Sequence, residues 1–229
     1  MSEAVIERPF SGGTVQASVR VEPAPVLAGG PCWLVFRVSV DDTTAPLYLA
    51  AGIEPQPGRS GDASISASLD GPLDDVATDT PALVGPSGAV PVESGQPYQQ
   101  RLLVNQYVRL EECLERLEPG GHGVLSLTFR RPFPLATDFP TALTNPHGET
   151  VDLRVDVELH RDDDALTAAI DELAGTLRRN WRDATSNEVE DAVRALVALR
   201  LPQSRDAIAA FSDHPLALVR EAAAAARTA

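Results

Sequence analysis

Apolar and polar residues alternate with a period of two in several parts of the first 160 residues. The alternation is clear over residues 15–21, 123–130 and 151–159. Successive side chains of a strand point to opposite faces of its sheet. These three segments therefore predict strands with one buried and one solvated face, as in antiparallel sheets.

The segment 32–40 differs because apolar residues occupy both of its faces for most of its length. This pattern predicts a central strand, or a strand covered by another part of the chain. Shorter candidate strands are residues 46–51, 64–69 and 99–108. Seven short strands with turn residues between them predict a two-sheet sandwich.

After residue 160 the apolar residues follow a helical period instead. The first predicted helix opens with three aspartates (162–164), carries an apolar stripe from Leu166 to Trp181, and closes with arginines at 178, 179 and 182. This charge order favours the helix dipole. Gly175 costs this helix about 1 kcal/mol relative to alanine. It therefore indicates close packing or a bend.

Three more helices are predicted. The second begins at a capping box from Thr185 to Glu188 and stops before Pro202. The third spans about 203–211, and the fourth follows Pro215.

The composition changes at the same place as the period. Residues 1–160 contain 17 of the 19 prolines and 15 of the 16 glycines, whereas residues 161–229 contain 18 alanines. Proline and glycine interrupt regular structure, and alanine has the highest helix propensity. The sequence thus predicts an α+β protein, with an antiparallel β-sandwich at 1–160 and an all-α, four-helix module at 161–229.

Residues 52–97 are rich in proline, glycine, serine and aspartate and contain no aromatic residue. Little in this stretch drives burial, so we expect a long, partly mobile excursion from the sandwich. Two interpretations stay open: a solvated insertion, or a binding loop that becomes ordered on a partner.

A turn in the first part resembles a feature of immunoglobulin-like sandwiches. Pro119 and Gly120 fit the two central positions of a type II turn. The turn leads into a predicted inner strand, like the penultimate corner of that family, and the resemblance covers residues 14–160. Members often carry a tyrosine two residues after the glycine. His122 stands there in this chain, so a tyrosine-corner hydrogen bond is not implied.

The helical part resembles HEAT repeats of the bacterial, lyase-like type. The similarity rests on the alanine-rich segments 192–199 and 207–211 and on the run from Asp213 through Pro215 to 219–224, and it covers residues 186–227. In that family an aspartate and an arginine form a hydrogen-bonded ladder between repeats. Asp213 and Arg220 are the matching positions, with a spacing one residue longer than usual.

Four helices supply at most two such repeats, and about three are needed to bury the apolar face of a solenoid. The helices must therefore pack on the β domain, on a second copy of the chain, or on another protein. We expect them to dock on the sandwich face that carries Trp33 and Val35. Five consecutive alanines at 222–226 offer a smooth surface for a close neighbour.

The charge narrows the range of partners. The net charge is −14, and all 19 basic residues are arginines. Nucleic acids and anionic membranes require a basic footprint, so neither is expected. No apolar stretch approaches the ~20 residues of a membrane span, and the acidic start does not resemble a signal peptide. With only two cysteines, the chain is expected in a reduced cytoplasm. The absence of lysine beside abundant arginine, alanine and proline predicts a GC-rich, bacterial source.

The sequence shows no motif of known catalytic or cofactor chemistry. It lacks a phosphate-binding glycine loop, paired metal-ligand motifs and a nucleophile elbow. His122, His147, His160 and His214 are scattered, so no metal is expected. The acidic pairs 74–75 and 111–112 are expected to be solvated. We predict no catalytic residue and no cofactor.

Cys32 and Cys113 leave several readings open. A disulfide or a nucleophile is conceivable if the two approach each other, but cysteine is among the most buried residue types. Cys113 also lies on a short helical pattern with Leu110, Leu114 and Leu117. We expect two inert, reduced thiols.

Three functions remain compatible with these patterns. The first is a non-enzymatic interaction, scaffold or assembly protein, with a protein partner and potential self-association through the helices. The second is an acidic inhibitor or immunity-type protein that neutralises a basic partner. The third is a hydrolase with an unrecognised site, which would require a deep pocket where carboxylates converge on His122.

Overall fold

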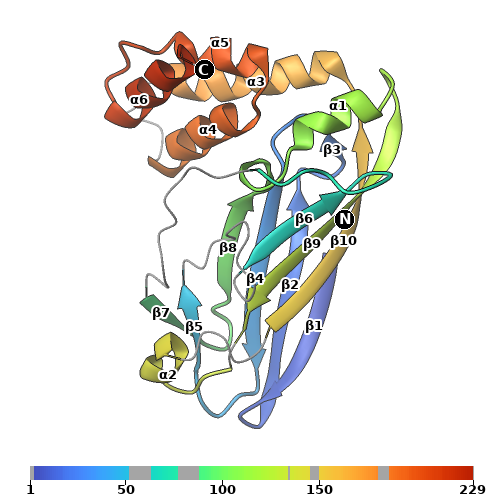
Figure 1. Cartoon of the computed structure of the whole chain (residues 1–229). Helices are drawn as coiled ribbons and strands as arrows, with labels where there is room; N and C mark the ends of the chain where they lie inside the picture. Colours follow the sequence, from blue (N-terminus) through green and yellow to red (C-terminus); the bar gives the residue numbers. More distant parts are fainter. Residues whose placement is uncertain are drawn as a thin grey trace.

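The computed structural model describes residues 3–51, 63–76, 88–133, 135–144, 150–179 and 186–228. Strands form the first part of the chain and four longer helices form the last part, so the protein is α+β. The helices lie together at one end of the sheets (Figure 1).

The first sheet has four antiparallel strands in the order β1-β2-β4-β8. Its strands are β1 (Glu3–Phe10), β2 (Gly13–Glu22), β4 (Trp33–Asp41) and β8 (Tyr98–Leu103). The turn from β1 to β2 consists of Ser11 and Gly12, with φ of 45° and 84°. Two central residues with positive φ make a type I′ turn, which matches the twist of a hairpin.

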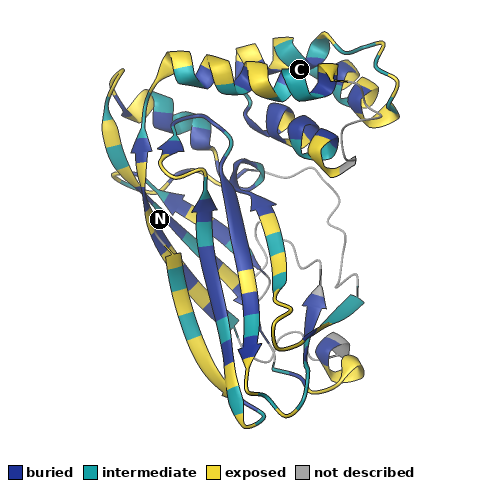
Figure 2. Ribbon diagram, turned by 180° about the vertical axis from the view of Figure 1, so that it is seen from behind, coloured by how far each residue is buried: buried dark blue, intermediate teal, exposed yellow. Residues whose placement is uncertain are grey.

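The second sheet has the order β3-β10-β9-β6. Its strands are β3 (Val26–Leu27), β10 (Thr150–His160), β9 (His122–Pro132) and β6 (Ser64–Ser68). All pairs are antiparallel except that of β3 with β10. Buried and exposed residues alternate along β10, as the sequence predicts, and the exposed bands of the strands are visible in Figure 2. A small third sheet pairs β5 (Leu47–Ala51) with β7 (Gly88–Val92).

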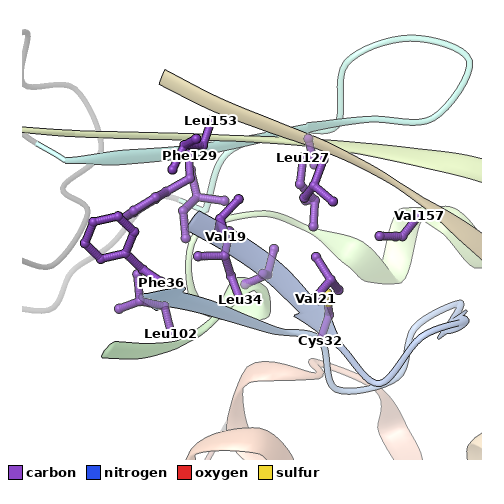
Figure 3. Close-up of a cluster of buried hydrophobic side chains, with 14 of the residues drawn as sticks. Val19, Val21, Cys32, Leu34, Phe36, Leu102, Leu127, Phe129, Leu153 and Val157 are labelled. Atoms are coloured by element: carbon purple, nitrogen blue, oxygen red, sulfur yellow. The ribbon is translucent and has the colours of Figure 1, made fainter. Parts of the chain in front are cut away.

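The two four-stranded sheets enclose one hydrophobic core. Side chains of the first sheet, such as Val19 and Phe36, point toward Leu127, Phe129 and Val157 of the second (Figure 3). The Phe36 and Phe129 ring centroids are 5.3 Å apart and the rings are tilted by 58°. This geometry is one that aromatic pairs prefer. The large rings thus join the layers at the centre of the core.

Strand β4 is central, as its two apolar faces predict. It pairs with β2 on one side and β8 on the other. Residues 33–36 are all buried. One face of this segment contributes to the core between the sheets, and Trp33 on the other face contacts the helices.

The strand predicted at 99–108 is wrong beyond Leu103. The chain turns there into two 3-10 helices, η1 (Val104–Gln106) and η2 (Leu110–Glu112), followed by α1 (Cys113–Arg116). Asn105 explains the change. Its buried side chain accepts the Cys32 N–H at 2.9 Å and donates to the Gly30 carbonyl at 3.0 Å. The segment is therefore held by a side chain rather than by a strand ladder.

The helices are α2 (Phe139–Thr144), α3 (Asp163–Arg178), α4 (Ser186–Ala198), α5 (Pro202–Ala209) and α6 (Ala217–Ala226). Helices α3 to α6 share a second core, in which Leu166, Ile170 and Leu177 of the predicted stripe are buried. Trp181, Arg182 and Thr185 lie outside the described residues. Within the described part of the chain, every helix is too short or too polar to cross a membrane.

Gly175 does not mark close packing. A Cβ built at this position in α3 meets no atom within 4 Å. Close packing, one of the two alternatives for this glycine, is therefore wrong, and the other, a bend in the helix, stays a prediction.

Within residues 52–97 the strand predicted at 64–69 is confirmed as β6, so the described parts of this stretch do not form one continuous excursion. Residues 63–76 contain β6, which joins the second sheet, and 88–97 contain β7. The buried apolar residues here are small or widely spaced: Ala63, Ile65, Ala67, Leu69, Leu73, Val76 and Val92. Their alternation drives burial despite the polar composition. Residues 52–62 and 77–87 lie outside the described residues.

Candidate binding site at the junction of sheets and helices

Helix α3 begins immediately after β10, and Arg161 occupies the connection. Its backbone N–H donates to the Gly121 carbonyl at 2.9 Å, and its own carbonyl accepts from the Gly120 N–H at 3.0 Å. The turn on the other side of this pair has Gly120 at φ 74° and a 2.8 Å bond from the Gly121 N–H to the Glu118 carbonyl. The predicted type II turn is thereby confirmed.

The Arg161 side chain ties this turn to the start of α3. Its Nη1 donates to the carbonyls of Leu114 and Leu117, the latter at 2.8 Å. Its Nε and Nη2 donate to the two carboxylate oxygens of Asp163 at 3.0 and 3.3 Å. The hydrogen bond from Arg161 lowers the pKa of the Asp163 carboxyl group, and the same bond raises the pKa of Arg161. The guanidinium therefore bonds both to the carbonyls that precede the turn and to the carboxylate at the start of α3.

A second arginine connects the far side of the helices to the sheets. Arg200 follows α4 with a φ of 55°, and its Nη1 donates to the Asn105 carbonyl at 2.7 Å. Glu111 lies 3.7 Å from the same nitrogen. Burial lowers the pKa of Arg200. Asn105, which already fixes the chain before β4, thus also anchors the end of α4.

Trp33 forms a third link. It packs with Leu103 against Ala195 and Ala198 of α4 in a small cluster of its own. The Arg101 guanidinium lies 4.1 Å from the centroid of its ring and 2.9 Å from Asp191 of α4. The expected docking on the Trp33 face is thus observed for Trp33. Val35 is buried but is not a member of this cluster.

Beside the Arg161 link the two parts line an apolar recess of about 340 Å³. Leu114 contributes from the β part, and Leu166, Ile170 and Leu201 contribute from the helices. The remaining lining residues are Arg161, Asp163, Thr167, Pro202 and Gln203. Leu114 contacts both hydrophobic cores, so the recess lies where the two cores meet. We call this cavity the apolar recess.

A second, polar hollow of about 410 Å³ adjoins the first and shares Arg161 and Asp163 with it. Its other lining residues are Pro119, Gly120, His122, His160, Asp162 and Asp164. The Asp162 carboxylate caps α3 by accepting the Ala165 N–H at 2.8 Å. We call this cavity the acidic hollow.

The structure brings two of the four histidines together. His122 and His160 face each other across β9 and β10, with stacked ring centroids 6.3 Å apart. His122 Nδ1 lies 3.5 Å from Glu158, and both side chains are 66 % exposed. His214 is elsewhere, in the turn before α6, and contacts the Leu177 carbonyl at 3.0 Å. His147 lies outside the described residues.

The described residues contain no cluster of three or more histidine, cysteine, aspartate or glutamate side chains suited to a metal ion. The acidic pair at 111–112 departs from the expectation of a solvated surface. Glu112 pairs with Arg116 at 3.0 Å and Glu111 with Arg200. Both acids therefore have a structural role in holding α1 and α4 in place.

The two cysteines are buried and unbridged. Burial raises the pKa of Cys32 far above its ordinary value, with a further rise from the nearby Cys113. Burial likewise raises the pKa of Cys113, to about 12. Both groups therefore stay protonated at neutral pH, and a thiol is a poor nucleophile compared with a thiolate. Cys113 packs in the core with Leu110 and Leu117, as its helical pattern predicts.

The proposed ladder positions are close in sequence but have different surroundings. Asp213 is exposed in the turn between α5 and α6. Arg220 Nη1 donates to the carbonyls of His214 and Pro215, each at 2.7 Å. The arginine thus stabilises its own turn, and a role of either residue between repeats stays a prediction.

Arg131 is a buried arginine of the sheet core that the hydrophobic pattern alone does not identify as important. It is only 2 % exposed, and its guanidinium donates to Gln100 and to the Ala50 carbonyl. Its carbon centre lies 5.0 Å from the Phe36 ring centroid and 5.6 Å from that of Tyr98. Burial lowers the pKa of Arg131. The period of two along β9 does predict an inward position for Arg131, because residue 131 lies on the same face of the strand as the inward-facing Leu127 and Phe129.

Comparison of the chain with protein-family models, curated proteins and solved structures returns no match. The immunoglobulin-like and HEAT-like resemblances therefore rest on the residues quoted for them.

Proposed function

We propose that the protein is a non-enzymatic interaction protein of the cytoplasm that binds a partner protein at the apolar recess. The carrying observation is the recess itself, an apolar cavity lined by Leu114 of α1, by Arg161 of the connection, and by residues of α3 and of the start of α5. Its charged groups, Arg161 and Asp163, are paired with each other. The lining is thus suited to receive an apolar group rather than to activate a substrate.

The links around the recess support the same conclusion. Arg161, Arg200 and Trp33 hold the helices to the sheets at three separate points. A cavity whose walls are fixed before binding avoids the cost of ordering them in the complex. Both families that the sequence resembles mostly bind proteins, although a fold alone does not determine a function.

The acidic hollow favours a second candidate, an inhibitor that neutralises a basic partner. This function would use the same surface, and the two candidates differ only in whether the partner loses an activity on binding. The hydrolase hypothesis is less favoured: carboxylates 162–164 do line the acidic hollow with His122, but the side chains of His122 and its partner Glu158 are both 66 % exposed rather than deeply enclosed.

The test is capture of partners from the native cell by the full chain and by two variants. Thr167→Trp places an indole in the recess from an exposed position of α3, without removing a buried apolar side chain. Ala168→Trp is the matched control, because Ala168 is the next exposed residue and does not line the recess. We expect one partner to be retained by the wild type and Ala168→Trp and lost by Thr167→Trp.

Equal retention by all three proteins would remove the recess as the binding site, and absence of any specific partner would contradict an interaction function. Thermal melting of each variant confirms that the fold is unchanged. Deleting residues 52–97 is not a usable test, because β6 and β7 belong to the folded sheets.

A further inference from the structure

We propose that the junction receives a basic segment of the partner protein, with an aliphatic side chain in the apolar recess and an adjacent lysine or arginine in the acidic hollow. This inference rests on the proposed function and adds the chemistry of the ligand.

The two cavities are positioned to be occupied together. Arg161 and Asp163 line both of them, so their ion pair is the wall that the cavities share. A single extended segment that crosses this wall can place neighbouring side chains on its two sides. The recess, at about 340 Å³, is near the lower limit of small-molecule sites, which span roughly 300–1,000 Å³. The recess therefore has ample room for an aliphatic side chain of a partner.

The charges beside the recess favour a cation. Asp163 neutralises Arg161, which is the one arginine that lines the acidic hollow. The carboxylates of Asp162 and Asp164 remain, and Glu158 borders the hollow through its contact with His122. A partner's lysine or arginine would offset this local excess of negative charge.

The N-terminus of a helix ordinarily attracts anions, but at α3 the helix's own carboxylates already occupy that position. Asp162 caps the free amide of Ala165, and Asp163 and Asp164 lie in the first turn. These carboxylates satisfy the positive end of α3. An incoming anion would meet them directly and be repelled.

The same charge argues against a second copy of this chain as the occupant. The chain carries a net charge of −14, and association of two such molecules at an acidic face is opposed by repulsion. A basic partner is attracted instead, and its association is accelerated by the field.

The probe is a pair of synthetic pentapeptides in which a leucine is flanked by two lysines or by two glutamates on each side. Each is titrated into the full-length, ¹⁵N-labelled protein and followed by NMR. We expect the lysine peptide to shift amide signals at the start of α3, at the start of α5 and in the turn 119–122. The glutamate peptide should leave them unmoved.

Charge variants give the quantitative part of the test. Asp164→Asn should weaken binding of the lysine peptide about two- to fivefold, the range for one exposed ion pair. Asp171→Asn, at an exposed position further along α3, should leave the affinity unchanged. Raising the salt from about 50 to 300 mM should weaken wild-type binding further, because exposed charges are screened.

Each contrary outcome identifies a different failure. Equal shifts with both peptides, no shifts at all, or an unchanged affinity in Asp164→Asn would overturn the basic ligand. If Thr167→Trp still abolishes capture of the native partner, the proposed function survives and only its ligand chemistry fails. Sedimentation that shows a dimer disrupted by Thr167→Trp would identify a second copy as the occupant and also overturn the inference.

Discussion

The core between the two sheets and the core among the four helices are filled by side chains of different size. Phe36, Phe129 and Phe133 lie at the centre of the first, and all three are at most 1 % exposed. The second consists of leucine, isoleucine, valine and alanine, with Phe211 only partly buried at its border. The sheet core is closed within the β part, by the two layers together with residues of the small sheet β5-β7 and of the segment 104–117. The helical core is completed by Leu27 and Leu114 of the β part.

The difference indicates which part depends on the other. The helices use the sheets as one wall of their core, and Trp33 supplies the largest side chain at the contact. The sheets take no comparable aromatic from the helices among the described residues. We therefore expect changes in the sheet core to unfold the whole protein, and changes at the junction to release the helices first.

The largest effect is expected for Phe36→Ala. Removing a fully buried ring leaves a cavity between the sheets and should lower the free energy of unfolding by about 4 kcal/mol. Urea denaturation should show loss of strands and helices in one transition. The matched control is Phe139→Ala, because Phe139 is 47 % exposed and its loss should cost less than about 0.5 kcal/mol. Equal effects of the two substitutions would contradict the assignment of the core.

Trp33→Ala sharpens the comparison at the junction. We expect a loss of about 3 kcal/mol, with the helical signal at 222 nm disappearing at lower urea than the strand signal. The reason is that α4 loses its main contact with the sheets. A single transition, with helices and strands still lost together, would show that the helices do not depend on this contact.

A smaller effect of opposite sign is expected for Gly175→Ala. The new methyl group meets nothing and the helix gains propensity, so stability should rise by about 0.5–1 kcal/mol. Gly13→Ala is the contrasting variant, because its Cβ would come within 2.1 Å of the Asp41 carbonyl oxygen, a backbone atom that cannot move aside cheaply. Thermal melting should therefore move upward for the first and downward for the second.

The smallest effect concerns the ion pair that separates the two cavities. Asp163→Asn should lower stability slightly near neutral pH. The folded-state pKa of Asp163 lies below its unfolded value, so the pair stabilises the protein above that unfolded value. Its contribution disappears as the pH falls through about 4 toward the folded value. Urea midpoints of wild type and variant should therefore converge as the solution becomes more acidic, and a difference that stays constant from neutral pH into acid would contradict the assigned partner.

Much of the fold could be predicted because its strands and helices carry regular patterns. The alternation in β2, β9 and β10 and the central position of β4 follow directly from the sequence. Strand β1 could not be found this way. Its residues are mostly exposed, and one apolar position, Val5, is 47 % exposed at the edge of the sheet.

The candidate site was harder to predict because it depends on contacts between distant segments. Arg161 marks the change of composition in the sequence, but its bonds to Leu114 and Leu117 span more than 40 residues. The acidic run 162–164 predicts a helix start, but no local pattern predicts that it lies near His122. The apolar recess is a product of docking, so no local pattern of residues encodes it.

The buried guanidinium of Arg131 has a consequence for how the small sheet moves. If β5 were to separate from the body, Arg131 would lose its acceptor at the Ala50 carbonyl while remaining among the rings of Phe36 and Tyr98. The guanidinium would keep its bond to Gln100 but lose one of its two acceptors, and an incompletely paired buried charge is unfavourable. Local fraying of β5 is thereby suppressed, and its backbone amides should exchange with deuterium only when the entire sheet core opens.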